Sequence, residues 1–411
     1  MSRIDDLIAE HCPNGVTYVE LQQLFDTRNG YTPSKSDVSL WADGSIPWFR
    51  MEDIRENGGV LNDAIQHVPE AAVKGGRLFA ANSILIATSA TIGEHALITV
   101  PHLSNQRFTS LALKHGFTHE LDMKFVYYYC FVLDDWCRAN ATVSSFASVD
   151  MVGFRRFRFP VPPLEVQREI VRILDHFTEL EAELEAELEA ELEARRQQYT
   201  YYRQFILHRM PAEPVALGSL GRWQGGVTPS TTNPDYWNGR IPWLASMDVS
   251  DESTDGIRGR VTDLALKETS LKIVPAPSVA VVLRSNILRR RLPIGLIKVD
   301  TTVNQDMRVL IPHEGVDAEY VYQALRAESE EIRRSCVRTD GSMAAVNSGD
   351  FFTWEIPLPS LQEQRRVATD LRSFDTLVND LRLGLHAELD ARRQQYEYYR
   401  DRLLTFEEAP A

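Results

Sequence analysis

The stretch ARRQQYTYYR (194–203) returns as ARRQQYEYYR (391–400), with nine of its ten residues unchanged. A second stretch, FPVPPLEVQRE (159–169), returns in a looser form as IPLPSLQEQRR (356–366). Both repeats have the same offset of 197 residues, so nothing is inserted between the two motifs in either copy. The chain therefore contains two copies of one long unit.

The duplication continues upstream in segments that otherwise differ. GYTPS (30–34) and IPW (46–48) return as GVTPS (226–230) and IPW (241–243). A repeat of this length excludes a solenoid, whose repeats are about 20–50 residues long. We interpret each copy as a variable domain followed by a nearly invariant arm.

The arms have the pattern of long helices. Apolar residues recur at spacings of three and four from 164 to 207, and again from 361 to 404, which is typical of a coiled-coil helix. The first arm contains the word LEAE three times (180–191), built from strong helix formers. Two such helices in one chain predict an intramolecular antiparallel coiled coil; arms that pair between chains remain an alternative. The leucines that begin the words are Leu180, Leu184, Leu188 and Leu192.

The variable domains are predicted to combine strands with some helix. SILIATSATIGEHALIT (83–99) and SVAVVLRSNILRRRLPIGLIKV (278–299) each contain two strand-like apolar runs around a turn. The predicted fold class is α/β, or α+β, with a pseudo-twofold internal repeat. The predicted divisions are a first domain over 1–163, a central helical arm over 164–210, a second domain over 211–360 and a C-terminal arm over 361–411.

Composition limits the class of protein. The 411 residues have a globular balance, with 44% hydrophobic and 25% charged residues, and the sequence contains neither a long apolar run nor a secretory leader. The four cysteines form no CxxC pair, so structural thiols in a reduced cytoplasm are expected. The net charge is −14, but residues 164–194 alone hold eleven acidic residues against two arginines. The remaining surface is near balance, and the overall charge does not exclude a DNA-binding face.

Motifs for common enzymes are missing from the sequence. It has no GxxxxGK[ST] loop for a nucleoside triphosphate and no GxGxxG after a strand. The closest approach to the base-holding loop of an amino-methyltransferase is NPDY (233–236), which has Asp235 where a second proline is needed and is interpreted as a turn. The ten histidines have no metal-ligand spacing.

Taken together, these features resemble the specificity subunit of type I restriction–modification systems, in the subgroup with tetrapeptide repeats. The resemblance extends over essentially the whole chain. It rests on the paired arms, on an NQ pair in each copy and on a P-x-P-x-L-x-x-Q motif at the start of each arm. The motif residues are Pro160, Pro162, Leu164 and Gln167, and Pro357, Pro359, Leu361 and Gln364.

The resemblance implies two target-recognition domains that each read one half of a bipartite DNA sequence. It also implies that the repeat number sets the length of the unread spacer. One LEAE word lengthens a helix by about 6 Å and rotates it by a net 40° or so. One base pair turns B-DNA by about 34° and advances it by about 3.4 Å, so the rotation fits a ruler of one word per base pair while the length of a word exceeds one base-pair step.

Candidate DNA contacts follow from residue type and position. Base reading needs directional donors and phosphate contact needs cations, and the turns that the two strand-like runs of each domain surround supply both. The NQ pairs recur in both copies, which indicates a scaffold or backbone role rather than base choice. The predicted DNA-binding residues are Thr88, Ser89, Thr91, Asn105 and Gln106 in the first copy, and Arg284, Ser285, Asn286, Arg289, Arg290, Arg291, Asn304 and Gln305 in the second.

The expected function is non-catalytic DNA recognition and assembly in a prokaryotic cytoplasm. The resemblance implies two methyltransferase subunits and a restriction subunit as partners, with S-adenosylmethionine, ATP and Mg²⁺ bound by those partners and no cofactor or metal in this chain. The alternatives are a methyltransferase or nuclease with an unrecognised active site, or a purely structural coiled-coil adaptor. Predicted partner or inter-arm contacts are Tyr199, Tyr202, Arg203, Tyr396, Tyr399 and Arg400.

Overall fold

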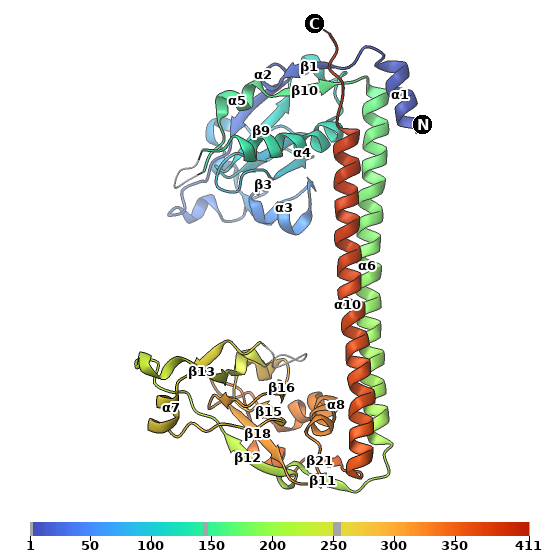
Figure 1. Ribbon diagram of the computed structural model, residues 1–411. Helices are drawn as coiled ribbons and strands as arrows, with labels where there is room; N and C mark the ends of the chain where they lie inside the picture. The colour runs from blue at the N-terminus through green and yellow to red at the C-terminus, as the bar shows by residue number, and fades with distance from the viewer. Residues whose placement is uncertain (1–2, 143–146, 250–255, 411) are drawn as a thin grey trace. The chain divides into compact units, whose positions relative to one another are not determined.

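The computed structural model describes residues 3–142, 147–249 and 256–410. Internal contacts divide the chain into two compact units, Met1–Ala186 with Glu388–Ala411, and Glu187–Ala387. Each unit contains one mixed α/β domain and a segment of each of two long helices (Figure 1).

The two long helices are continuous. α6 covers Leu164–His208 and α10 covers Leu361–Leu403, each beginning directly after a proline-containing segment, as the sequence predicts. The LEAE words are helical throughout. Leu180 is 45% exposed and the three following leucines of the tract are half-buried, so the words form only a narrow apolar seam.

The first domain is built on a five-stranded sheet of order β2-β9-β6-β7-β4, beside a three-stranded sheet of order β5-β3-β8. The central strand β6 (Ser83–Ala87) is buried on both faces. Its Ile84 and Ile86 pack toward helix α4 and the first turns of α6, whereas Leu85 and Ala87 pack toward the smaller sheet. The remaining strands are β1 (Thr17–Glu20), β2 (Phe25–Asn29), β3 (Ile46–Phe49), β4 (Val60–Leu61), β5 (His67–Val68), β7 (His95–Ile98), β8 (Leu103–Ser104), β9 (Phe108–Leu113) and β10 (Arg158–Val161), and the helices are α1 (Arg3–His11), α2 (Leu21–Leu24), α3 (Met51–Asn57), α4 (Met123–Ala139) and α5 (Met151–Arg156).

The second domain repeats this plan, with four strands in its larger sheet among the residues that the structure describes. A four-stranded sheet of order β12-β18-β15-β16 lies beside a three-stranded sheet of order β14-β13-β17. β15 (Ser278–Val282) takes the place of β6, with Val279 and Val281 packed toward helix α8. The other elements are β11 (Pro214–Ala216), β12 (Gly221–Gly225), β13 (Trp237–Leu244), β14 (Gly259–Val261), α7 (Asp263–Glu268), β16 (Ile294–Ile297), β17 (Thr302–Val303), β18 (Met307–Pro312), α8 (Ala318–Cys336), β19 (Val337–Arg338), β20 (Ala345–Val346), α9 (Ser348–Thr353) and β21 (Glu355–Pro357).

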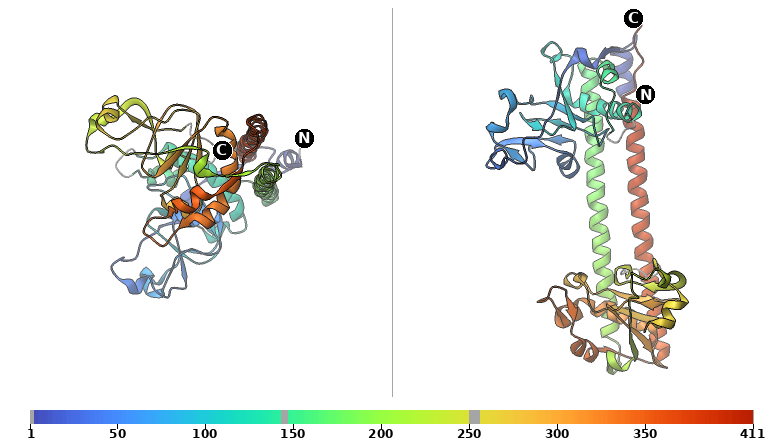
Figure 2. Two further views of the ribbon diagram at one scale, coloured as in Figure 1. Left: turned by 90° about the horizontal axis from the view of Figure 1, so that it is seen from below. Right: turned by 90° about the vertical axis from the view of Figure 1, so that its left-hand side faces the viewer.

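The two helices pack antiparallel within each unit, and both units use the same aromatic contact. In the first unit the rings of Phe177 on α6 and Tyr396 on α10 lie 6.5 Å apart. In the second unit Tyr199 on α6 lies 6.2 Å from Phe374 on α10, with the helix roles exchanged. The pairing predicted within a single chain is therefore confirmed, and Figure 2 shows the helix segments side by side from two further directions.

Candidate nucleic-acid interface

Three sequence motifs converge at one corner of the first domain. GYTPS follows strand β2, IPW is strand β3, and the NQ pair lies between β8 and β9. Gly30 lies at the start of the corner. This position requires glycine because a Cβ here would overlap the backbone oxygen of Asn105. The β3–β8 pairing then places Trp48 opposite Leu103, two residues before Asn105.

Two tryptophans form the floor of this corner. The Trp48 indole donates a hydrogen bond to the carbonyl of Tyr31 over 3.0 Å, which holds β3 against GYTPS. The ring of Trp41 meets it edge-on, with centroids 5.0 Å apart and an interplanar angle of 85°. Trp41 in turn donates to the carbonyl of Ser34 over 2.9 Å. Trp48 is buried and Trp41 is half-buried, so an indole surface remains accessible.

The NQ pair lies on the opposite side of the corner from the two tryptophans. The hydroxyl of Thr32 donates to the side-chain oxygen of Gln106. The side-chain oxygen of Asn105 accepts from the backbone N–H of Arg107 over 2.9 Å, which fixes the turn into β9. We call this arrangement of Trp pair, Thr–Gln bond and Asn turn the indole–amide corner.

The second domain contains the same corner. Trp243 donates to the carbonyl of Val227 over 3.1 Å, and Trp237 meets it edge-on at 5.0 Å and 90°. Thr228 donates to Gln305, and Asn304 accepts from the backbone N–H of its second neighbour, Asp306, over 3.2 Å. Gly226 is again pressed against the backbone oxygen of the asparagine. The two domains differ in sequence but share the indole–amide corner, which is therefore a common frame.

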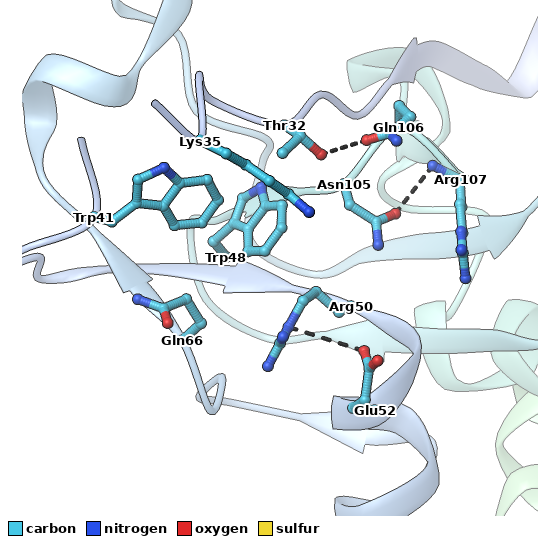
Figure 3. Close-up of a pocket in the computed structure, with 10 residues that line it drawn as sticks. All are labelled: Thr32, Lys35, Trp41, Trp48, Arg50, Glu52, Gln66, Asn105, Gln106 and Arg107. Atoms are coloured by element: carbon cyan, nitrogen blue, oxygen red, sulfur yellow. Dashed lines mark hydrogen bonds and ion pairs between the residues drawn. The ribbon is translucent and has the colours of Figure 1, made fainter. Parts of the chain in front are cut away.

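The first corner borders a hollow of about 470 Å³ with three cations around it (Figure 3). Lys35 lies beside the two indoles, and Arg107 extends from the far side of Asn105. Arg50 is 3.9 Å from the carboxylate of Glu52. Such a mixture of cations, amides and exposed ring surface suits the phosphates and base edges of a nucleic acid.

Comparison with known proteins identifies the family of this repeated domain. The type I restriction modification DNA specificity domain matches residues 13–194 and again 211–391. The chain belongs to this family. The specificity subunit of type I restriction enzyme EcoprrI from Escherichia coli is 39% identical over 384 residues, which cover 89% of each chain. The Escherichia coli EcoR124I/EcoR124II specificity subunit is 39% identical over 299 residues, covering 69% of this chain and 71% of the relative.

Solved structures share the fold at lower sequence identity. A chain from a structural study of complex assembly and conformational transition of the type I R-M system matches with a TM-score of 0.71 and 15% identity, covering 95% of this chain and 98% of that one. The HsdS subunit from Thermoanaerobacter tengcongensis matches with a TM-score of 0.56 and 15% identity, over 95% and 97% of the two chains. The present chain is thus a type I specificity subunit with two DNA specificity domains, a recognition subunit and not an enzyme.

The predicted turn of the first domain, which contains Thr88, Ser89 and Thr91, lies directly beside the corner. The backbone N–H of Thr88 donates to the carbonyl of Arg107 over 2.9 Å. The Thr88 side chain itself is buried and its hydroxyl bonds to Thr109, so Thr88 packs inside the domain. Ser89 forms a bridge with Ser148, and the Thr91 hydroxyl is buried without a hydrogen-bond partner among the described residues.

The predicted basic turn of the second specificity domain is a short 3-10 helix, Asn286–Arg289, capped by Ser285. Its arginines have different environments. The guanidinium of Arg289 donates to the carbonyls of Thr339 and Gly341, at 3.0 and 2.9 Å, and so ties two loops together. Arg290 is exposed and Arg291 is half-buried. Arg284 and Asn286 are exposed on either side of Ser285.

The predicted arm residues divide into inner and outer sets. Tyr199 is buried between the helices, where its hydroxyl donates to the Leu371 carbonyl over 3.1 Å and burial raises its pKa to about 12. Arg203 is buried beside it and pairs with Asp375 at 3.0 Å. In the first unit, Tyr396 takes the inner position and Arg400 lies over the ring of Phe131, whereas Tyr399 is 39% exposed and its ring also stacks on Phe177 of α6 at 6.2 Å. Tyr202 is 45% exposed.

Of the residues that line the hollow, only Asn105 and Gln106 were among the predicted DNA contacts. Sequence reasoning missed the three cations Lys35, Arg50 and Arg107 and both tryptophans, Trp41 and Trp48. A second tryptophan precedes IPW by four or five residues in both copies, and this repeat is a signal that could have indicated the corner. Within the residues described, no cluster of three or more His, Cys, Asp or Glu side chains could hold a metal ion. The described helices also include none that is long and apolar enough to cross a membrane.

Proposed function

We propose that the two specificity domains read the two half-sites of one bipartite DNA target, and that the helical arms set the spacer and scaffold the partner subunits in the cytoplasm of a prokaryote. The proposal rests on one observation. Both domains contain the indole–amide corner, but different side chains surround it in each domain. A duplicated frame supports two equivalent placements on DNA, and different surroundings support two different sequences. The exposed residues of both corners and both turns are the proposed contact set, which leaves out Thr88 and Arg289 because their side chains bond within their own domains.

The arm surfaces support two copies of one partner. Tyr201 and Tyr202 on α6 are 61% and 45% exposed, and the residues 197 positions later, Tyr398 and Tyr399 on α10, are 62% and 39% exposed. Exposed tyrosine pairs are typical of protein interfaces. Because the pairs lie at equivalent positions of a repeat, one protein surface can bind both.

We infer that the partner on these tyrosine pairs is the methyltransferase subunit, bound in two copies, and that the restriction subunit joins that complex. S-adenosylmethionine would then be bound by the methyltransferase subunit. ATP and Mg²⁺ would likewise be supplied on partner subunits. This chain would contribute the recognition of the two DNA half-sites and the spacing between them.

Reconstitution tests the proposal. The purified chain with labelled S-adenosylmethionine and DNA should transfer no methyl group, whereas addition of the methyltransferase subunit should give methylation at one bipartite sequence. Native mass spectrometry should show two methyltransferase subunits per chain. Methyl transfer by the chain alone, or methylation without a bipartite sequence, would contradict the proposal.

The tyrosine pairs allow a sharper stoichiometry test. Replacing Tyr201 and Tyr202 with alanine should leave a complex with one methyltransferase subunit, and replacing all four tyrosines should leave none. The matched control is Leu383→Ala, which removes a 62% exposed apolar side chain elsewhere on α10. Two bound subunits after loss of either tyrosine pair would place the partner surface elsewhere.

A further inference from the structure

The two indole–amide corners differ at three equivalent positions. The residue after TPS is Lys35 in the first domain and Thr231 in the second. The residue two places after the IPW tryptophan is Arg50 or Ala245. The residue after NQ is a third position, Arg107 in the first domain and aspartate in the second. The frame is thus constant while the side chains that surround it change in charge.

These substitutions reverse the character of the corner. The lining of the first corner has three cations and one carboxylate, Glu52. The equivalent positions of the second corner have no cation, and the residue after NQ is the carboxylate of Asp306. Arg107 therefore offers hydrogen-bond donors, whereas Asp306 offers a half-buried carboxylate acceptor, one oxygen of which already accepts from the Asn304 amide over 3.3 Å.

The cations of the first corner are largely uncommitted. The side chains of Lys35 and Arg107 are exposed, and neither forms a hydrogen bond or ion pair with the part of the chain that the structure describes. Arg50 approaches Glu52 at 3.9 Å and lies over the Trp48 ring, 5.9 Å from its centroid, and its Nε is buried with no hydrogen-bond partner among the described residues. A buried donor without a partner is costly, so a ligand that accepts from it would be favoured.

The corner is also continuous with the turn that follows the central strand. The carbonyl of Arg107 accepts from the N–H of Thr88, and the carbonyl of Asp306 accepts from the N–H of Leu283 over 2.8 Å. The residue after NQ is thus joined by its backbone to the start of the turn in both domains. A nucleotide at the corner would therefore lie beside the turn.

We propose that the first corner is a DNA contact site and that the residue after its NQ pair determines which base its half-site requires. Arginine recognises the acceptor edge of guanine, whereas aspartate accepts from the amino group of cytosine. In the first domain Arg107 donates to the base, with Lys35 and Arg50 holding the adjoining nucleotide against the indoles. In the second domain Asp306 takes the place of Arg107. This inference rests on the proposed DNA-reading function and names the residues that carry its specificity.

The test transfers residues of the second domain to the first. The chain with its methyltransferase subunits is used to select duplexes from a library randomised across the site, for the parent and for Lys35→Thr, Arg50→Ala and Arg107→Asp. We expect Arg107→Asp to change the base required in the first half-site, with discrimination shifting about ten- to a hundredfold, while the second half-site is unchanged. The reciprocal variant Asp306→Arg should change only the second half-site.

Salt dependence separates base reading from phosphate contact. A variant that loses one phosphate contact should reduce the slope of log affinity against log salt by about 0.9, at an unchanged sequence. The matched control is Arg55→Ala, which removes one positive charge from the same domain where it already pairs with Glu94 at 2.6 Å. Thermal melting of each variant shows whether the domain remains folded.

The outcomes are distinct. Retention of the parent sequence by the folded Arg107→Asp variant overturns the inference, even if a slope changes. Unfolding of all three first-domain variants would assign the cations to domain stability and overturn it as well. If the parent complex itself selects no bipartite sequence, the proposed function fails, which is a different result from variants that keep the parent's sequence.

Discussion

The side-chain oxygen of Gln167 accepts a hydrogen bond from the backbone N–H of Asp122 over 2.8 Å. The amide nitrogen of Gln167 donates to the carbonyls of Glu120 and Pro162, at 2.7 and 2.6 Å. Asp122 is the N-cap of α4, so one glutamine fastens the first turn of α6 to the start of α4. In the second unit Gln364 bonds in the same way to the N–H of Asp317 over 2.8 Å. The glutamine repeated at the start of each arm is therefore a structural lock.

Replacing Gln167 with alanine should destabilise the first unit. The change leaves one backbone donor and two carbonyls without their partner, and each unsatisfied buried group costs about 1–3 kcal/mol. Gln364→Ala should do the same in the second unit. Denaturant unfolding gives the free energy of unfolding, with Gln198→Ala, an exposed glutamine on α6, as the control. A change no larger than in that control would rule out the lock.

Deleting Leu184–Glu187 removes one LEAE word and should shift the spacer of the DNA target to one base pair fewer. The helix loses about 6 Å and a net rotation of 40° or so, close to the twist of one base pair. Both domains keep their own cores, so both half-sites should persist. Mapping of methylated motifs in cells that carry the deletion checks this. Half-sites at the original spacing would show that the tract is only a solvated helix.

The helix pairing adds a second expectation for the same deletion. Phe177 and Tyr199 on α6 are separated by as many residues as Phe374 and Tyr396 on α10. Shortening α6 alone upsets this match, so one aromatic contact must slip. A variant that also lacks Leu385–Glu388 of α10 restores it and should melt at a higher temperature than the single deletion. Equal melting temperatures would mean that the aromatic contacts do not set the helix register.

Arg290→Ala should lower the salt dependence of DNA binding, whereas Arg289→Ala should lower stability. Arg290 is exposed in the basic turn, and loss of one phosphate contact reduces the log–log slope by about 0.9. Arg289 instead donates to two loop carbonyls, so its loss should lower the melting temperature and leave the slope unchanged. Binding measured between about 50 and 200 mM salt, together with melting curves, separates the two. An unchanged slope in Arg290→Ala would remove that arginine from the DNA contact.

His102 should make the first unit sensitive to acid. Burial lowers the pKa of His102 from 6.5 to about 4, because the imidazole lies between the rings of Phe49 and Phe79. The unfolded chain takes up this proton first as the pH falls, so the contribution of neutral His102 is complete above about pH 6.5 and is lost progressively toward pH 4. The full shift corresponds to about 3 kcal/mol.

The second domain supplies the variant that tests this. Phe79 pairs with His102 in one domain as Val274 pairs with Thr301 in the other, so His102→Thr introduces the equivalent residue. The variant's free energy of unfolding should fall less between pH 6.5 and 4 than that of the parent. Equal pH dependence in both proteins would show that His102 does not carry the effect.

The sequence by itself determined the duplication, the two long helices and the class of protein. Helical periodicity and repeated words are local properties, so they can be read without knowing what the residues contact. The predicted helix starts at Leu164 and Leu361 are those observed, because a proline-containing segment precedes each. The central strands around 83–99 and 278–299 were likewise visible as short apolar runs.

Only the tertiary structure decided which side chains meet. Lys35, Arg50 and Arg107 come from three separate segments, which the β3–β8 pairing and the Trp48–Tyr31 hydrogen bond bring to one hollow. A second example is an ion pair that occurs in both units with the charges of its two members exchanged. Lys124 of α4 pairs with Asp175 of α6 at 2.5 Å, while Glu319 of α8 pairs with Arg372 of α10 at 2.9 Å. Neither sequence copy indicates the match, because the charges are reversed. Contacts between distant segments depend on how strands and helices bury their apolar faces, and that choice belongs to the whole fold.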